Sequence, residues 1–400
     1  MTATPSSNHA AVYRLREVAA EYARSVPTDA FHWEAWHALS EAGLWRLPVP
    51  REEGGAGLTW TAFTEAFEAI VATLRSIGFA MVVANQATLI RALLKHGSAA
   101  QRASFLPRLL AGTPAATAIS EKHTGTEIRA LQTALSVHEE GFLLDGHKYN
   151  ISQAPTAGII LVAAQLIDGE RATTALVLLD GGRPGVTRSA PRDTLGVRDL
   201  PIGDLAFEGV PIAANQLLGP PAQGLHRLMD IASMNRAYFG LLCANVVMPF
   251  LDDAMRYASE RKALDAAIDT HQHVQRRLVD IRIGAESTRW TARAALDQLV
   301  AGDPAALANC SVAKLVGARE LARSALDLLA LHGSDGYRRG PLASFVADAL
   351  AMTSAGGTEE MHRRNIFAQM QRQAAATLEK PAVPAAPSAH PLISRSPEPA

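Results

Sequence analysis

Residues 274–299 read VQRRLVDIRIGAESTRWTARAALDQL and carry the clearest periodic pattern of the chain. Its apolar or weakly polar stripe consists of Val274, Leu278, Ile281, Ala285, Thr288, Ala292, Ala295 and Leu299. Spacings of four and three residues alternate, so one face of a helix stays apolar for several turns. The pattern predicts a long helix in a bundle whose helices pack nearly antiparallel.

Outward from this helix, the pattern divides the chain into four regions. Helical periodicity extends over residues 221–376 and also fills residues 1–114, where Gly- and Pro-rich stretches interrupt it. Residues 115–220 instead show short alternating or β-branched runs between turns, which predict a β-domain. Residues 377–400 are rich in Pro, Ala and Ser, so we expect a disordered tail. The expected fold class is α+β, mostly α.

The composition excludes several classes of protein. Of 400 residues, 48% are hydrophobic and 19% charged, which suffices for a large core, and the formal net charge is −1. A charge near zero argues against a broad surface for nucleic acid or anionic lipid. Cys243 and Cys310 are expected to be buried thiols. No signal pattern begins the chain, and its most apolar run, residues 238–250, is shorter than the roughly 20 residues of a membrane span, so we expect a cytoplasmic protein.

Generic catalytic and metal-binding motifs are missing from the sequence. It has no phosphate-binding Walker loop, no dinucleotide-binding glycine fingerprint and no serine-nucleophile elbow. His271 and His273 are two residues apart and would point to different faces of a helix, so we expect no metal site. His332, before Gly333, suits a helix C-terminus. These residues alone give a domain order without a reaction.

A series of short motifs follows along the chain. They are PREEGGAGL at 50–58, AISE at 118–121 with GTE at 125–127, GHKYNIS at 146–152, LGVR at 195–198, LAFEGVPI at 205–212, YASERK at 257–262, HGSDGY at 332–337 and GGTEE at 356–360. Each is weak alone, but together and in this order they resemble the acyl-CoA dehydrogenase superfamily. The resemblance implies an N-terminal helical domain, a central β-barrel or sandwich and a C-terminal four-helix bundle.

The resemblance also implies a cofactor, a substrate class and an assembly. These are FAD, a thioester carried on CoA or on a carrier protein, and a homodimer or homotetramer. On the family pattern the flavin and phosphates would meet Ile119, Ser120, Thr126, Asn150, Ile151, Ser152 and Thr358. Arg261, Gln272 and Gly333 would reach the FAD of a neighbouring subunit.

The chain departs from the family where the chemistry occurs. Family members remove an α-proton with a carboxylate while a hydride passes to the flavin, and the position of that carboxylate is Gly356 here. A second family position for the base, just before Arg236, is Asn235. General base catalysis contributes roughly 10²–10⁴-fold, so ordinary desaturation should be crippled. Glu359 and Glu360 are the nearest spare carboxylates, although compensation of a helix dipole explains them more simply.

Lost aromatic side chains indicate a changed substrate. Asn150 and Ala355 replace a Trp and a Tyr of the family, and with Gly356 they would widen a cavity that has Arg236 at its mouth. The favoured hypothesis is a flavoenzyme of secondary metabolism that oxidises or oxygenates a bulky acyl or polyketide-type thioester.

Two alternatives remain open from the sequence. One is an ordinary acyl-CoA dehydrogenase whose base has moved to Glu359 or Glu360. The other is a flavin-independent member that catalyses a non-redox cyclisation or elimination.

Overall fold

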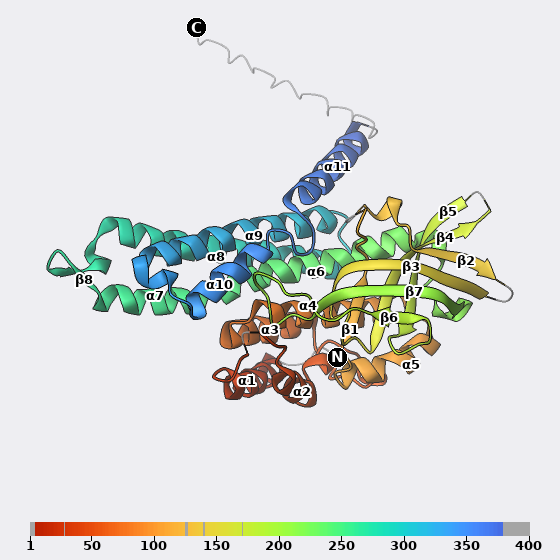
Figure 1. Ribbon diagram of the computed structural model, residues 1–400, viewed down its shortest axis with the longest axis horizontal. Helices are drawn as coiled ribbons and strands as arrows, with labels where there is room; N and C mark the ends of the chain where they lie inside the picture. The colour runs from red at the N-terminus through yellow and green to blue at the C-terminus, as the bar shows by residue number, and fades with distance from the viewer. Residues whose placement is uncertain (1–4, 28, 125–126, 139–140, 170, 379–400) are drawn as a thin grey trace, which may run out of the picture.

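The computed structural model describes residues 5–378 except 28, 125–126, 139–140 and 170. Its first part is helical and contains α1 (Pro5–Tyr22), α2 (Trp33–Glu41), α3 (Trp60–Leu74), α4 (Ile77–His96) and α5 (Ala99–Leu110). Short 3₁₀ turns along the whole chain are η1 (Leu44–Arg46), η2 (Arg51–Glu53), η3 (Ile128–Ala130), η4 (Ala214–Gln216), η5 (Pro221–Gln223), η6 (Ile268–Thr270) and η7 (Gly333–Tyr337). Figure 1 shows α1, α2 and α3 beneath the later helices and α5 beside the sheet.

The central part is a sheet with its own apolar core. The strands are β1 (Ala115–Ala118), β2 (Ala134–His138), β3 (Gly141–Ser152), β4 (Ile159–Asp168), β5 (Arg171–Asp180), β6 (Val186–Arg188) and β7 (Ile202–Ala213). They pair in the order β1-β4-β2-β3-β7-β6, with β5 on β4. β4 runs parallel to β1 and β2, and the other pairs are antiparallel. One face buries side chains such as Leu144, Val162 and Phe207.

The last part is the predicted helical bundle. It contains α6 (Gly224–Val246), α7 (Met248–Glu260), the small hairpin β8 (Lys262–Ala263) and β9 (Ala266–Ala267), α8 (Gln272–Ala301), α9 (Ala306–Leu331), α10 (Pro341–Ala351) and α11 (Glu359–Leu378). α6, α8 and α9 pack on one another, and α11 packs on α9 while projecting from the body (Figure 1). The stripe of α8 is buried from Leu278 to Leu299, and Val274 is half-buried. The predicted fold class is confirmed.

The close contact between α6 and α9 requires glycine on both helices. A Cβ on Gly317 of α9 would lie 3.1 Å from the Cα of Gly240 on α6. Such a distance is tighter than side-chain contacts normally allow, so the two backbones approach with no side chain between them. This approach brings the inner faces of α6 and α9 together, and both helices carry residues of the candidate site.

Helix α4 is the most apolar long helix of the described chain. By length and composition it could cross a membrane, but 89% of its apolar window is buried inside the protein. The prediction that residues 238–250 form the most apolar run is therefore wrong, because α4 is longer and more apolar as a candidate span. Its composition follows from its place between the bundle and the sheet, where it contacts both α6 and β1.

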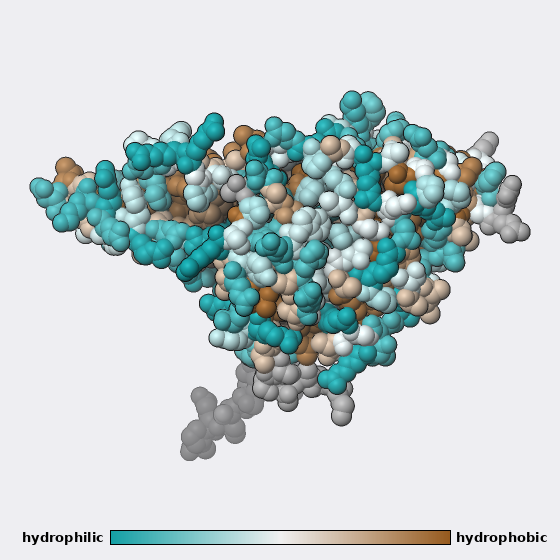
Figure 2. Space-filling model, turned by 60° about the horizontal axis from the view of Figure 1, so that its bottom comes forward, coloured by the Kyte–Doolittle hydropathy of each residue, from teal (hydrophilic) through white to brown (hydrophobic). Residues whose placement is uncertain are grey.

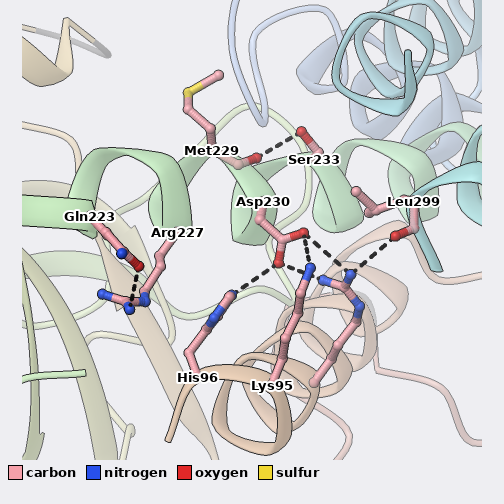
Figure 3. Close-up of polar contacts among 9 residues, drawn as sticks. Lys95, His96, Gln223, Arg227, Met229, Asp230, Ser233 and Leu299 are labelled. Carbon is pink, nitrogen blue, oxygen red and sulfur yellow. Dashed lines mark hydrogen bonds and ion pairs between the residues drawn. The ribbon is translucent and has the colours of Figure 1, made fainter. Parts of the chain in front are cut away.

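One buried carboxylate joins α4 to α6. Asp230 accepts hydrogen bonds from Arg91 Nη1 at 2.8 Å and Lys95 Nζ at 2.9 Å, and His96 Nε2 lies 3.2 Å from its Oδ2 (Figure 3). Arg91 also donates to the carbonyl of Leu299 at the end of α8, at 3.3 Å. Burial would raise the pKa of Asp230, but its bonds to His96, Arg91 and Lys95 hold that pKa well below its usual range.

We expect Asp230→Asn to lower the free energy of unfolding at neutral pH by about 3–5 kcal/mol, because it leaves the buried Arg91 guanidinium without its carboxylate partner. The native pKa of Asp230 lies below the unfolded value, so its contribution is full above about pH 4 and is lost as the pH falls further. Urea unfolding at several pH values measures both effects. Asp253→Asn, at an exposed pair with Arg75, is the control and should cost at most about 1 kcal/mol. Equal effects of the two variants would contradict this account.

Candidate functional site

The first group of predicted site residues lies where the chain leaves β1 beside β3. Lys148 Nζ donates to the carbonyl of Ile119 at 3.1 Å, and the Tyr149 N–H donates to the carbonyl of Ser120 at 2.8 Å. Ile119 and Ser120, the two residues predicted for the site, are half-buried. Their backbone is therefore fixed against the strand that carries the other members of the group.

A buried ion pair orders this loop. Lys148 Nζ lies 2.8 Å from Glu121 Oε1, and Glu121 also accepts the N–H groups of Gln132 at 2.6 Å and Thr133 at 3.0 Å. Burial lowers the pKa of Lys148 to about 8, although Glu121 opposes the shift. Both residues belong to quoted motifs, yet no sequence pattern predicts the pairing of Glu121, in the loop after β1, with Lys148 on β3.

Asn150 sits in a bulge of β3. Its φ of 54° is left-handed, a conformation that Asn tolerates better than most residues, and the pairing with β7 shifts between Lys148 and Ile151. The Asn150 N–H donates to Asp204 Oδ1 at 3.0 Å, while its side chain is exposed. Ile151 is buried and Ser152 half-buried. Thr126, also predicted for this group, lies outside the described residues.

The second predicted group lies at the far end of the bundle. Arg261 and Gly333 line one cleft of about 230 Å³ together with Tyr257 and His332, and Gln272 begins α8 nearby in the chain. The hairpin after Arg261 and the sheet lie at opposite ends of the long axis (Figure 1). Since the 30 residues of α8 span about 45 Å, the two groups are far apart within one chain.

The third group surrounds Gly356, the position predicted for the missing carboxylate. Gly356 has φ +70°, and a Cβ there would lie 2.9 Å from Cδ2 of Phe239 on α6. The next residue, Gly357, has φ +112°, and its carbonyl accepts a hydrogen bond from Lys314 Nζ at 2.6 Å. Gly356 is exposed and Gly357 is buried. The local backbone thus favours glycine, and a glutamate cannot be restored without strain.

Arg236 does not lie at the mouth of a cavity as the sequence analysis expected. It is 6% exposed, and its Nη2 lies 3.7 Å from Met361 Sδ, beneath the first turn of α11. The neighbouring Asn235 donates from Nδ2 to Asn85 Oδ1 at 2.6 Å, across the contact between α6 and α4. The structure places Arg236 beside the start of α11, and its burial is a property of three helices that the sequence does not reveal.

The spare carboxylates are engaged at the start of α11. Glu359 accepts hydrogen bonds from Arg363, one of them from Nε at 2.9 Å. Glu360 is exposed, and bonds from its own N–H and from Thr358 hold its pKa below the usual value. Thr358 caps the helix by accepting the Met361 N–H at 3.4 Å. These contacts support helix capping: the Glu359 carboxylate is engaged by Arg363, and the lowered pKa of Glu360 makes it a weaker base.

Two further residues of this region were missed by the sequence analysis. Lys314 is 2% exposed, and His362 is fully buried. His362 is the second residue after the GGTEE motif, so its position in the sequence was a usable signal. Lys314 lies in an apolar stretch of α9, where a buried lysine is unusual.

Comparisons with known proteins cover nearly the whole chain. Family models for the N-terminal, middle and C-terminal domains of acyl-CoA dehydrogenases match residues 10–113, 116–210 and 222–371. The short-chain specific acyl-CoA dehydrogenase of mouse mitochondria (Mus musculus) is 28% identical over 84% of this chain and 81% of its own length.

Solved structures share the fold. The prolyl acyl carrier protein oxidase AnaB superposes with a TM-score of 0.82 at 23% identity, over 90% of this chain and 98% of its own. PigA, solved with FAD and proline, superposes with a TM-score of 0.83 at 20% identity, over 93% of this chain and 99% of its own.

We expect Gly356→Ala to destabilise the protein more than Gly302→Ala, by about 1–3 kcal/mol. Both glycines have a similar positive φ, +70° and +78°, so the backbone strain of the two substitutions is similar. A Cβ at Gly302 meets nothing within 4 Å, whereas one at Gly356 meets Phe239. Parallel urea unfolding of both variants makes the comparison. If the two cost the same, Phe239 does not restrict position 356.

Proposed function

The chain belongs to the acyl-CoA dehydrogenase family, and on this premise we propose that it oxidises or oxygenates a thioester-bound acyl group without a carboxylate base. The observation that carries the proposal is the pair Gly356 and Asn235 at the two base positions of the family. The contacts of Glu359 and Glu360 leave the hypothesis of a relocated base without support.

FAD is the cofactor of this family, and the residues present suit it. The fixed backbone of Ile119 and Ser120, together with Ile151 and Ser152, offers hydrogen-bonding groups without adding charge. A Cβ on Gly333 would meet nothing within 4 Å of its own chain, so the cleft beside Arg261 is open to a ligand. When bound, FAD supplies a hydride acceptor. This assignment leaves the flavin-independent alternative without support.

Other basic groups near Gly356 are poor substitutes for the lost carboxylate. Lys314 Nζ donates to the Gly357 carbonyl, and burial lowers the pKa of Lys314 to about 8, so this group is mainly protonated at neutral pH and is then no proton acceptor. Burial, Arg236 and Lys314 together lower the pKa of His362 to about 3, which makes its imidazole a weak base. The chain can therefore bind and orient an acyl group at this site but lacks a strong acceptor for an α-proton.

The substrate class follows from the size of the replaced side chains. Ala355 and Asn150 are smaller than the aromatic residues of the family pattern, which favours a bulky, oxygenated acyl group. AnaB, whose name describes an oxidase of a prolyl carrier protein, supports a carrier-bound thioester as one possibility beside CoA. A role in secondary metabolism is consistent with such a substrate.

We further propose that two or more copies assemble and share the cofactor. The Arg261 cleft and the β-domain group lie at opposite ends of one chain, so a single FAD can meet both only across two subunits. Val279, Ile283 and Trp290 on α8 are 54%, 56% and 65% exposed, as expected for a face that another copy covers. Figure 2 shows hydrophobic groups among hydrophilic ones on the face that it presents, including the arm formed by the bundle.

The purified protein should show flavin absorption but should not desaturate butyryl-, octanoyl- or palmitoyl-CoA. With ferricenium or electron-transfer flavoprotein as acceptor, we expect a rate at least about 100-fold below that of a family dehydrogenase assayed in parallel, because base catalysis is lost. Turnover within about tenfold of that control would contradict the proposal.

Light scattering should give the mass of a dimer or tetramer at micromolar concentration. Ile283→Glu should shift the protein toward monomer and lower its flavin content, because the cofactor site is then incomplete. Val137→Glu, on an exposed position of β2, is the matched control and should change neither quantity. A wild-type monomer with a full complement of flavin would contradict the shared site.

A further inference from the structure

Three basic side chains converge beneath the loop between α10 and α11. Arg236 comes from α6, Lys314 from α9 and His362 from α11. Arg236 Nη2 lies 3.7 Å from Met361 Sδ, and Lys314 Nζ donates to the Gly357 carbonyl at 2.6 Å. A Cβ on Gly357 would lie 3.2 Å from His362 Nε2. Met361 contacts Arg236, while Gly357 lies against both Lys314 and His362, so the three bases lie around one short segment of the chain.

Two of the bases have unpaired hydrogen-bonding groups. Within the described chain, Arg236 Nε and Nη1 have no acceptor, and neither ring nitrogen of His362 makes a hydrogen bond. The backbone groups of Gly356 and Gly357 near the ring raise the pKa of His362, but by less than burial, Arg236 and Lys314 lower it. A buried unpaired group is costly, and folded proteins keep few of them. Several at one place indicate partners that a ligand supplies.

The buried thiols that face this cluster do not compensate its positive charge. Burial lowers the pKa of Arg236 to about 10 and that of Lys314 to about 8. The thiols that face them are Cys310 and Cys243, whose pKa burial raises to about 12, so both are neutral at physiological pH.

One carboxylate of α11 reaches the cluster electrostatically. Glu359 raises the pKa of Lys314, but its side chain is 40% exposed and ion-paired with Arg363. Its charge is therefore shared with another cation and screened by water. A buried anion would offset the desolvation of the bases far more effectively.

The position of the cluster beside Gly356 explains why it lacks a buried carboxylate. Gly356 occupies the position of the family's carboxylate, and a Cβ there would lie 4.0 Å from Lys314 Cε. The three bases thus surround a position where the family has an acid and this chain has a glycine. Because Gly356 is exposed, the cluster can be approached from the side of this glycine.

We propose that Arg236 and His362 bind a carboxylate carried by the acyl group of the substrate, beside Gly356. This proposal rests on the proposed function and names its substrate class. A carboxylate has two oxygens, so it can accept from one unpaired donor of each base, while Lys314 contributes charge. The site would then select acyl thioesters that carry an acid group over neutral ones of equal length.

Isothermal calorimetry on the full chain, with flavin as isolated, tests the site with small probes. Propionate should bind saturably, and propionamide, which has a similar shape without the charge, should not. Arg236→Gln should weaken propionate at least about tenfold. Arg227→Gln is the control, since Arg227 lies on the same helix and is 8% exposed, but its donors are satisfied by the Pro220 carbonyl and Gln223 Oε1, the latter drawn in Figure 3.

A second arm separates a substrate carboxylate from a free anion. Succinyl-CoA should bind at least about tenfold tighter than butyryl-CoA of equal chain length, and Arg236→Gln should remove the difference. Equal affinity for the two thioesters, or inorganic phosphate binding as tightly as propionate, would overturn the assignment to a substrate carboxylate.

The remaining outcomes are also decisive. No saturable binding of propionate, equal binding of propionamide, or unchanged binding in Arg236→Gln would overturn the proposal. If that variant does not fold, Arg236→Lys and His362→Gln replace it, and both should weaken propionate. Calorimetry requires neither turnover nor an electron acceptor, so a failure here is distinguishable from a failure of the proposed function.

Discussion

The helical part of the molecule depends on the buried carboxylate of Asp230. Helix α4 is apolar along most of its length, so hydrophobic packing alone leaves its orientation weakly specified. Arg91, Lys95 and His96 at its end converge on Asp230, and Arg91 also reaches the last turn of α8. A charge removed from water requires a partner at a defined place, so this cluster sets α4, α6 and α8 relative to one another.

The need of a buried charge for a partner also distinguishes the candidate site from the rest of the core. Lys148 is buried beside Glu121, and Arg293 is paired with Glu68. Arg236, further along the helix that carries Asp230, is equally buried but has only a thioether as a partner in the described chain. Paired charges hold the fold, and we propose that the unpaired charge marks where the protein meets its ligand.

Much of the fold was predictable because periodicity and turn residues report local structure. The stripe of α8 is buried as expected, and the β-region forms one sheet with its own core. The site was predicted only in part. The motifs located Gly356 and Arg236, but the burial of Arg236 and its approach to Lys314 and His362 depend on three helices far apart in sequence. The positive φ of Gly356 and its contact with Phe239 likewise arise from tertiary packing.

The central claim is that a flavin-binding site of this family operates here without a base for the α-proton. The most direct test is the incorporation of deuterium at the α-carbon of butyryl-CoA in heavy water, followed by mass spectrometry without an electron acceptor. Exchange requires proton abstraction but no turnover, so it isolates the missing step. The account predicts bound flavin and no exchange above the rate without enzyme. Exchange at a rate near that of a family dehydrogenase would contradict it.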